Sequence, residues 1–123
     1  MANPNIASAT NLYGNNAAVT LTTTTATQLI NNPSGSGKIF KINVINAANT
    51  NSTAVNLTLT LYSEAALGGT AYPLANTLGI PANAGMLLVD KSNSIYLLEN
   101  QSIGVTAGTA NFVSVVAVWD EIS

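Results

Sequence analysis

The sequence contains no cysteine, no histidine and no arginine, and only three lysines and five acidic residues among its 123 positions. Without cysteine there is no disulfide and no thiol nucleophile, and without histidine the most common general base and zinc ligand is missing. Three lysines cannot form the clustered positive charge that neutralises phosphates. We therefore expect a protein that is not an enzyme, binds no cofactor and has no nucleic-acid partner.

The few carboxylates offer no catalytic or metal-binding arrangement. Asp120 and Glu121 are adjacent on a predicted strand, so their side chains should point to opposite faces, and we interpret them as a solvated terminus rather than a catalytic pair. Asp90 and Glu99 lie near asparagines, but neither has the regular acidic spacing of a dedicated calcium site around it. We assign no catalytic, cofactor-binding or metal-ligating residue.

Signals for export and for membrane insertion are also missing. The first residues have neither the basic region nor the apolar region of a signal peptide. No apolar run approaches the roughly 18 residues of a membrane-spanning helix. We expect synthesis in the cytoplasm and no membrane partner.

Neutral hydrogen-bonding side chains take the place of the missing charge, with 17 asparagines and 15 threonines in the chain. Such a surface is hydrated but carries little charge, and the formal net charge is only -2. Association between like surfaces is therefore little opposed by long-range repulsion and should depend weakly on salt. This composition favours a homo-oligomer, with a monomer kept soluble by Asn and Thr as the alternative.

The clearest structural pattern lies in residues 38–62. Within residues 55–61, valine and leucine alternate with polar residues, which places apolar side chains on one face of a strand. Residues 40–45 alternate in the same way, and the Asn- and Ser-rich residues between the two stretches are typical of a turn. We interpret the two stretches as one antiparallel hairpin.

Short apolar stretches separated by turn residues continue along the chain. Residues 31–37 are the strongest turn signal, because proline fixes its own φ and glycine accepts positive φ. Residues 64–71 are predicted to be a loop with one helical turn, and residues 72–74 and 78–81 brief extended pieces around prolines. About eight short strands in this rhythm predict an all-β protein with a single antiparallel β-sandwich, with jelly-roll connections as one option.

The first 16 residues are predicted to form an extended N-terminal arm ahead of a sandwich domain that spans residues 17–123. Ile6, Leu12 and Tyr13 are the large apolar side chains of the arm. Three such residues are too few to bury one another, so the arm is either loose or laid against a neighbouring subunit, and the three apolar side chains favour the second.

The last segment, residues 112–119, is apolar on nearly both faces of a predicted strand. A strand of this kind is covered on both sides. Either it is central in its sheet with a partner over the outer face, or it is the best-buried strand of the core. Trp119 and Tyr96 have the same two interpretations, as partner contacts or as core residues.

The C-terminal third contains four strand motifs: Ile-Pro-Ala at 80–82, Ile-Tyr-Leu at 95–97, Ser-Ile-x-Val at 102–105, and an apolar last strand that ends in Glu121-Ile122. With these motifs it resembles the closing portion of small virion structural proteins of tailed bacteriophages, including those of marine and cyanobacterial phages. Asn100-Gln101 stands where such proteins often have Gly and Asp before the Ser-Ile strand.

This resemblance implies a β-sandwich built into a phage particle, with assembly in the cytoplasm of a bacterial host. Small size, the lack of catalytic residues and the unanchored arm favour a capsid cement or decoration protein. We expect it to be a trimer that bridges capsomers by contacts with the major capsid protein or other virion proteins. The alternatives are a tail, neck or fibre component, a receptor-binding or carbohydrate-binding module, and a polysaccharide-degrading enzyme.

Overall fold

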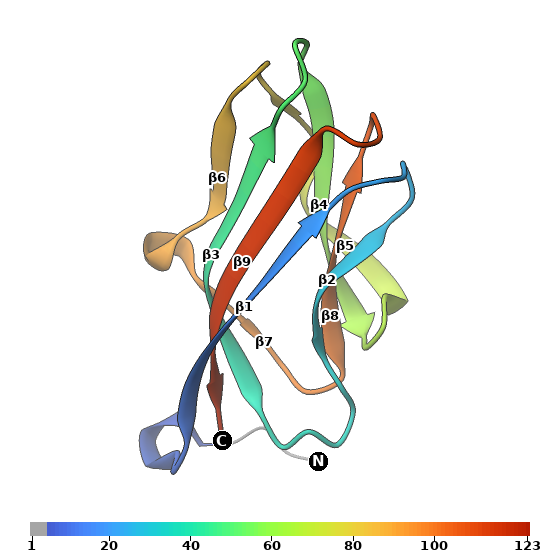
Figure 1. The fold of residues 1–123 in the computed structure, drawn as a ribbon. Coiled ribbons are helices and arrows are strands. Elements are labelled where there is room, and N and C mark those ends of the chain that lie inside the picture. Colours follow the sequence, from blue (N-terminus) through green and yellow to red (C-terminus); the bar gives the residue numbers. More distant parts are fainter. Residues whose placement is uncertain (1–4) are drawn as a thin grey trace.

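The computed structural model describes residues 5–123 and is built mainly of β-strands (Figure 1). Two three-residue 3₁₀ helices, η1 (Ile6–Ser8) and η2 (Lys91–Asn93), are the only helices in this part of the chain, and neither is long enough to cross a membrane. The strands are, in chain order, β1 (Leu12–Thr20), β2 (Thr27–Asn32), β3 (Ile39–Asn49), β4 (Val55–Glu64), β5 (Gly68–Ile80), β6 (Gly85–Val89), β7 (Ile95–Leu97), β8 (Gln101–Ala107) and β9 (Val113–Ile122).

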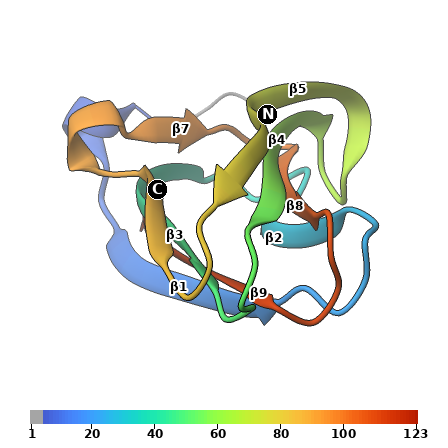
Figure 2. The same cartoon turned by 90° about the horizontal axis from the view of Figure 1, so that it is seen from above.

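The strands form two antiparallel sheets packed face to face (Figure 2). The first sheet has the order β1-β9-β3-β6, with β7 also paired to β3, and the second has the order β2-β8-β4-β5. The chain can be described as one long hairpin that has its turn between β4 and β5 and is wrapped into the two layers. Its strand pairs are β1–β9, β2–β8, β3–β6 and β4–β5. This is a jelly roll. The predicted all-β sandwich is confirmed, with nine strands in residues 5–123 where about eight were predicted.

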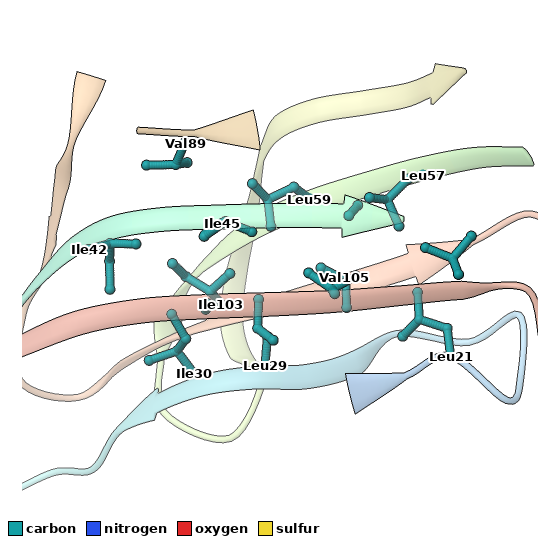
Figure 3. Packing of buried hydrophobic residues seen from close by; sticks show 14 of the residues in the cluster. Leu21, Leu29, Ile30, Ile42, Ile45, Leu57, Leu59, Val89, Ile103 and Val105 are labelled. Carbon is teal, nitrogen blue, oxygen red and sulfur yellow. The ribbon is translucent and has the colours of Figure 1, made fainter. Parts of the chain in front are cut away.

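Apolar side chains from alternate positions of the strands fill the space between the sheets (Figure 3). Ile42 and Ile45 of β3 pack there with Leu57 and Leu59 of β4 and Val105 of β8, and each is at most 1 % exposed. Burying one such side chain contributes about 1.5–3 kcal/mol. The core therefore fixes which face of each strand is left outside.

The strands β3 and β4 do not pair with each other, so the predicted hairpin in residues 38–62 is wrong. β3 pairs with β6, β7 and β9 in the first sheet, whereas β4 pairs with β5 and β8 in the second. Residues 50–54 cross from one sheet to the other. The predicted alternation is present in β4, but in β3 a register shift between Ile42 and Val44 interrupts it, so that Ile45 and not Val44 follows Ile42 into the core. A strand with one buried face has the same pattern whether the next strand lies beside it or opposite it, so the alternation could not reveal the pairing.

Asn49 holds this crossing in place. Its side chain is 2 % exposed. Nδ2 donates to the carbonyl oxygens of Thr53 (3.0 Å), Ile80 (3.0 Å) and Pro81 (3.3 Å), and Oδ1 accepts from the Asn51 N–H (2.9 Å). A buried amide with all these partners ties the link after β3 to the end of β5.

The predicted boundary between arm and sandwich at residue 16 falls inside a strand. Residues 12–16 form the first half of β1 and pair with β9, starting with Leu12 opposite Ile122. Residues 1–4 of the predicted arm lie outside the described residues. Residues 12–16 of the predicted arm are therefore part of an edge strand of the sandwich, whose backbone groups on one side bond to the last strand of the same chain.

The segment after β4 also differs from the prediction. The predicted loop over residues 64–71 is shorter than expected, and the chain turns at Ala66 and Leu67, with φ of 57° and 59°. From Gly68 onward it continues as one strand of 13 residues, β5, in place of the two brief extended pieces that were predicted. Gly69 also has a positive φ, 72°, which glycine accepts readily, but in the turn itself two residues with side chains adopt it.

Candidate assembly surface

The outer face of the five-stranded sheet carries a band of apolar side chains, defined here by Ala18, Val44, Leu87, Val116 and Val118. Val44 is half-buried and the other four are exposed. Val116 of β9 lies opposite Ala18 of β1, and Val118 lies opposite Val44 of β3. Leu87 of β6 adds a further large apolar group on the other side of β3 and is 54 % exposed. These five residues come from four strands and form one neutral band across the sheet.

The last strand, β9, explains how this face arises. Val113, Val115 and Ala117 point into the core and are fully buried, whereas Val116 and Val118 point outwards and are 41 % and 38 % exposed. β9 lies between β1 and β3, so it is central in the sheet. The central position agrees with the first predicted interpretation, and the outer face of β9 is left uncovered by its own chain. A partner over that face stays a prediction.

Charged side chains lie at one end of this face. Lys41 and Asp120 sit opposite each other on β3 and β9, and Asp120 Oδ2 accepts a hydrogen bond from Asn43 Nδ2 at 3.1 Å. Residues 114–118 and the residues opposite them on β1 and β3 are all apolar, Ser, Thr or Asn. A partner could cover that band without removing a charge from water, which costs several kcal/mol per ion.

Three of the predicted partner contacts are exposed at the start of the chain. Ile6 on η1 is 45 % exposed, Leu12 is 66 % exposed and Tyr13 is 63 % exposed. Leu12 and Tyr13 are the most exposed large apolar residues in residues 5–123. Both stand at the start of β1, so the structure brings them to one sheet edge. Their contact with a neighbouring subunit stays a prediction.

Trp119, the fourth predicted contact, is in the core. It is 6 % exposed, and its ring stacks on Phe40 with 5.9 Å between ring centroids. A side chain directed between the two sheets cannot offer its surface to a partner, so the core interpretation is the right one. Tyr96 on β7 is instead 47 % exposed and lies opposite Lys41.

The prediction that Glu121 belongs to a solvated terminus is wrong, because its carboxylate is largely buried and hydrogen-bonded to residues of other strands and loops. Its side chain is 14 % exposed. Burial raises the pKa of the Glu121 carboxyl, but the surrounding hydrogen bonds and the positive charge of Lys38 outweigh burial and hold the pKa below its usual value. The donors around the carboxylate are Asn15 Nδ2 (2.8 Å), Lys38 Nζ (2.9 Å) and Trp119 Nε1 (3.3 Å).

Replacing Glu121 by glutamine should make the free energy of unfolding less dependent on pH in the acidic range. The folded pKa lies below that of the unfolded chain, about 4.3, so the ionised carboxylate stabilises the fold above that pH. This stabilisation is lost as the pH falls through the folded pKa. We expect the free energy of unfolding to drop more steeply for the wild type than for Glu121→Gln between about pH 6 and pH 3. Urea unfolding at each pH measures this, and parallel profiles would contradict it.

Asp90 and Glu99, the carboxylates considered for calcium, hold loops. The Asp90 carboxylate caps η2 by accepting from the Ser92 N–H at 2.9 Å. The Glu99 carboxylate accepts from the N–H groups of Gly35 and Gly37 at 3.1 and 3.0 Å, which closes the predicted glycine-rich turn. Among residues 5–123, no three acidic side chains gather into a metal site, and no cavity is present.

Sequence reasoning found the outward valines of β9 but not the residues that extend the band. Val44 lies in a stretch whose alternation is interrupted by a register shift between Ile42 and Val44. Leu87 lies in a short apolar run that does not reveal which side chain points outwards. Only the pairing of the strands shows that Val44 lies beside β9 and that Leu87 lies one strand further, on the other side of β3.

No protein-family model and no curated protein sequence matches the chain. Among solved structures, the chain is similar to a protein of Bacillus endospore appendages, which are described as disulfide-linked pili. The identity is 12 %, the TM-score is 0.53, and the match covers 91 % of this chain and 88 % of that chain. This likeness shows a shared fold.

Two viral structures are also similar. A chain of the cyanophage Pam1 capsid asymmetric unit has 16 % identity and a TM-score of 0.39, with 99 % of this chain and 91 % of that chain covered. A chain of the T13 particle of infectious bursal disease virus has 7 % identity and a TM-score of 0.49. The match covers 93 % of this chain but only 31 % of the viral chain.

Proposed function

We propose that this chain is a structural protein of a tailed-phage particle, without catalytic activity, and that it serves as a capsid cement or decoration protein. The observation that carries the proposal is the neutral, apolar outer face of the five-stranded sheet, where Val116 and Val118 remain 41 % and 38 % exposed. Contiguous exposed apolar surface on a soluble domain is typical of a protein–protein contact site. The resemblance of the C-terminal strand motifs to phage virion proteins supports the same assignment.

A cement protein acts by adding contacts that bridge neighbouring subunits of the shell. Covering the exposed parts of Leu87, Val116 and Val118 would contribute a few kcal/mol per copy, of the order expected for apolar burial. Many copies bound to one shell would each contribute such a term, so the stabilisation of the shell would grow with the number of copies. Because the face has few charges, the contact would persist over a wide range of salt concentration.

A filament or tail component is the second candidate, and the fold shared with the Bacillus appendage protein favours it. Those appendages are described as disulfide-linked pili, whereas this chain has no cysteine. A filament built from this chain would therefore be held by non-covalent contacts between sheets and strand edges. The same outer face would be covered in that case, by another copy instead of a capsid protein.

The position of the protein in purified particles tests the proposal. We expect mass spectrometry to find it in particles purified from an infected bacterial host, and electron microscopy with a labelled copy to show it over the whole shell. Label confined to the tail, the neck or the fibres would replace the cement role by the second candidate. Particles that lack the protein altogether would contradict a virion role.

A further inference from the structure

We propose that the edge strand β1 pairs with β1 of a second copy of this chain, in antiparallel orientation, about a two-fold axis through Asn16. The pairing would join two five-stranded sheets into one continuous sheet. This inference goes beyond the proposed function, because it rests on the geometry of β1 and does not depend on where the protein is located.

The strand β1 has an unused side. It lies at the edge of its sheet, where it pairs only with β9. The pairing runs without a register shift from Leu12, which lies opposite Ile122, to Thr20, which lies opposite Ser114. An edge strand presents a row of backbone N–H and C=O groups that can pair with another chain. Nine residues is long for such an edge, since the typical strand has about five or six.

The backbone groups that point outwards can be identified. Asn11 exchanges two main-chain hydrogen bonds with Ser123, at 2.9 and 3.0 Å, and the Leu21 N–H donates to the Val113 carbonyl at 2.8 Å. Bonded positions alternate along an antiparallel pair. Odd-numbered residues of β1 therefore bond to β9, and the even-numbered residues from Leu12 to Thr20 direct their backbone groups away from it.

The other sheet edges are short or irregular. β2, β6 and β7 have six, five and three residues, and both β2 and β6 pair with a register shift. β5 is longer, but it contains Pro73, has three register shifts against β4 and places Thr77 at a φ of 48°. Prolines, bulges and shortness are the devices that prevent edge pairing. β1 has none of them and no charged residue.

A two-fold axis through Asn16 uses the whole strand. It places Leu12 opposite Thr20 and Gly14 opposite Ala18 of the second copy, so that every outward-directed residue meets another. The Asn16 N–H is held by Asn15 Oδ1 at 2.8 Å, and the remaining groups would form about eight main-chain hydrogen bonds. This is within the range of a typical protein interface, about ten.

The side chains agree with this pairing. Tyr13 would lie opposite Val19 of the second copy, and an aromatic residue opposite a β-branched residue is a favourable cross-strand pair. Leu12 would be partly covered by Thr20. Leu12 and Tyr13 are 66 % and 63 % exposed without a partner. The pairing would thus cover the two most exposed large apolar residues in the described part of the chain.

Charge swapping at Asn16 tests the proposal. Asn16 is exposed, and the two-fold axis would place residue 16 opposite its own copy. We expect the wild type to sediment as a dimer, and not as the trimer that the resemblance to phage virion proteins implies. Asn16→Lys and Asn16→Glu should each raise the dissociation constant about fivefold or more, because like charges then lie directly opposite. An equal mixture of the two variants, one carrying a mass tag, should form mixed dimers with at least wild-type affinity.

Asn46→Lys is the matched control, since Asn46 is an exposed asparagine on the same face of the same sheet but on the central strand β3. It should leave the dimer intact, and far-ultraviolet circular dichroism should show all variants folded. A monomeric or trimeric wild type would overturn the proposal. Failure of the mixture to restore dimers, or equal dissociation by Asn46→Lys, would also overturn it.

Discussion

Replacing Asn49 by alanine is expected to lower the free energy of unfolding by about 3 kcal/mol, because buried partners lose their hydrogen bonds. Nδ2 of Asn49 donates to the carbonyls of Thr53, Ile80 and Pro81, and Oδ1 accepts from the Asn51 N–H. Leaving a buried polar group unpaired costs about 1–3 kcal/mol. Urea unfolding followed by the fluorescence of the single, buried tryptophan measures the change.

The matched control for this change is Asn46→Ala. Asn46 is the same residue type on the same strand, but its side chain is exposed. Substitutions at such surface positions usually change stability by less than about 0.5 kcal/mol. Equal losses in the two variants would mean that Asn49 does not hold the crossing between the sheets.

Strand content could be predicted from the sequence, because one buried face imposes a period of two. The alternation in residues 55–61 marks β4, and the two-faced apolarity of residues 112–119 marks β9 as central. The turn at residues 31–37 is also where the glycines and proline place it, with Gly35 and Gly37 at φ of 80° and 68°. Local steric and solvation terms determine these features.

Strand pairing could not be predicted in the same way. Whether β3 and β4 pair or face each other across the core depends on contacts between distant segments, such as Asn49 with Ile80. The same applies to β1, whose partner β9 is at the opposite end of the chain. Residues 12–16 look like a loose arm only as long as that partner is unknown.

The candidate surface was predictable only in part. The sequence indicates that Leu12 and Tyr13 lack local partners, and both are exposed. It could not separate Trp119 from these residues, because a tryptophan suits a core and an interface equally. Stacking on Phe40 decides between the two, and that contact joins β3 and β9.

The double substitution Val116→Asp with Val118→Asp is expected to abolish binding to the particle while the fold is kept. Both side chains point out of the sheet and are 41 % and 38 % exposed, so carboxylates there would be hydrated in the free protein. In the assembly, each would have to leave water without a partner, at a cost of several kcal/mol. Binding should weaken about 100-fold or more.

The claim on which the proposed function depends is that the outer face of the five-stranded sheet is covered in the particle. It is tested most directly by titrating particles assembled without the protein with three purified forms: wild type, the double variant and Leu74→Asp. Leu74 is 44 % exposed on β5, in the other sheet, so its replacement adds a carboxylate away from the proposed contact. We expect Leu74→Asp to bind like the wild type and the double variant to stay in solution. A double variant that remains folded and binds as tightly as the wild type would contradict the account.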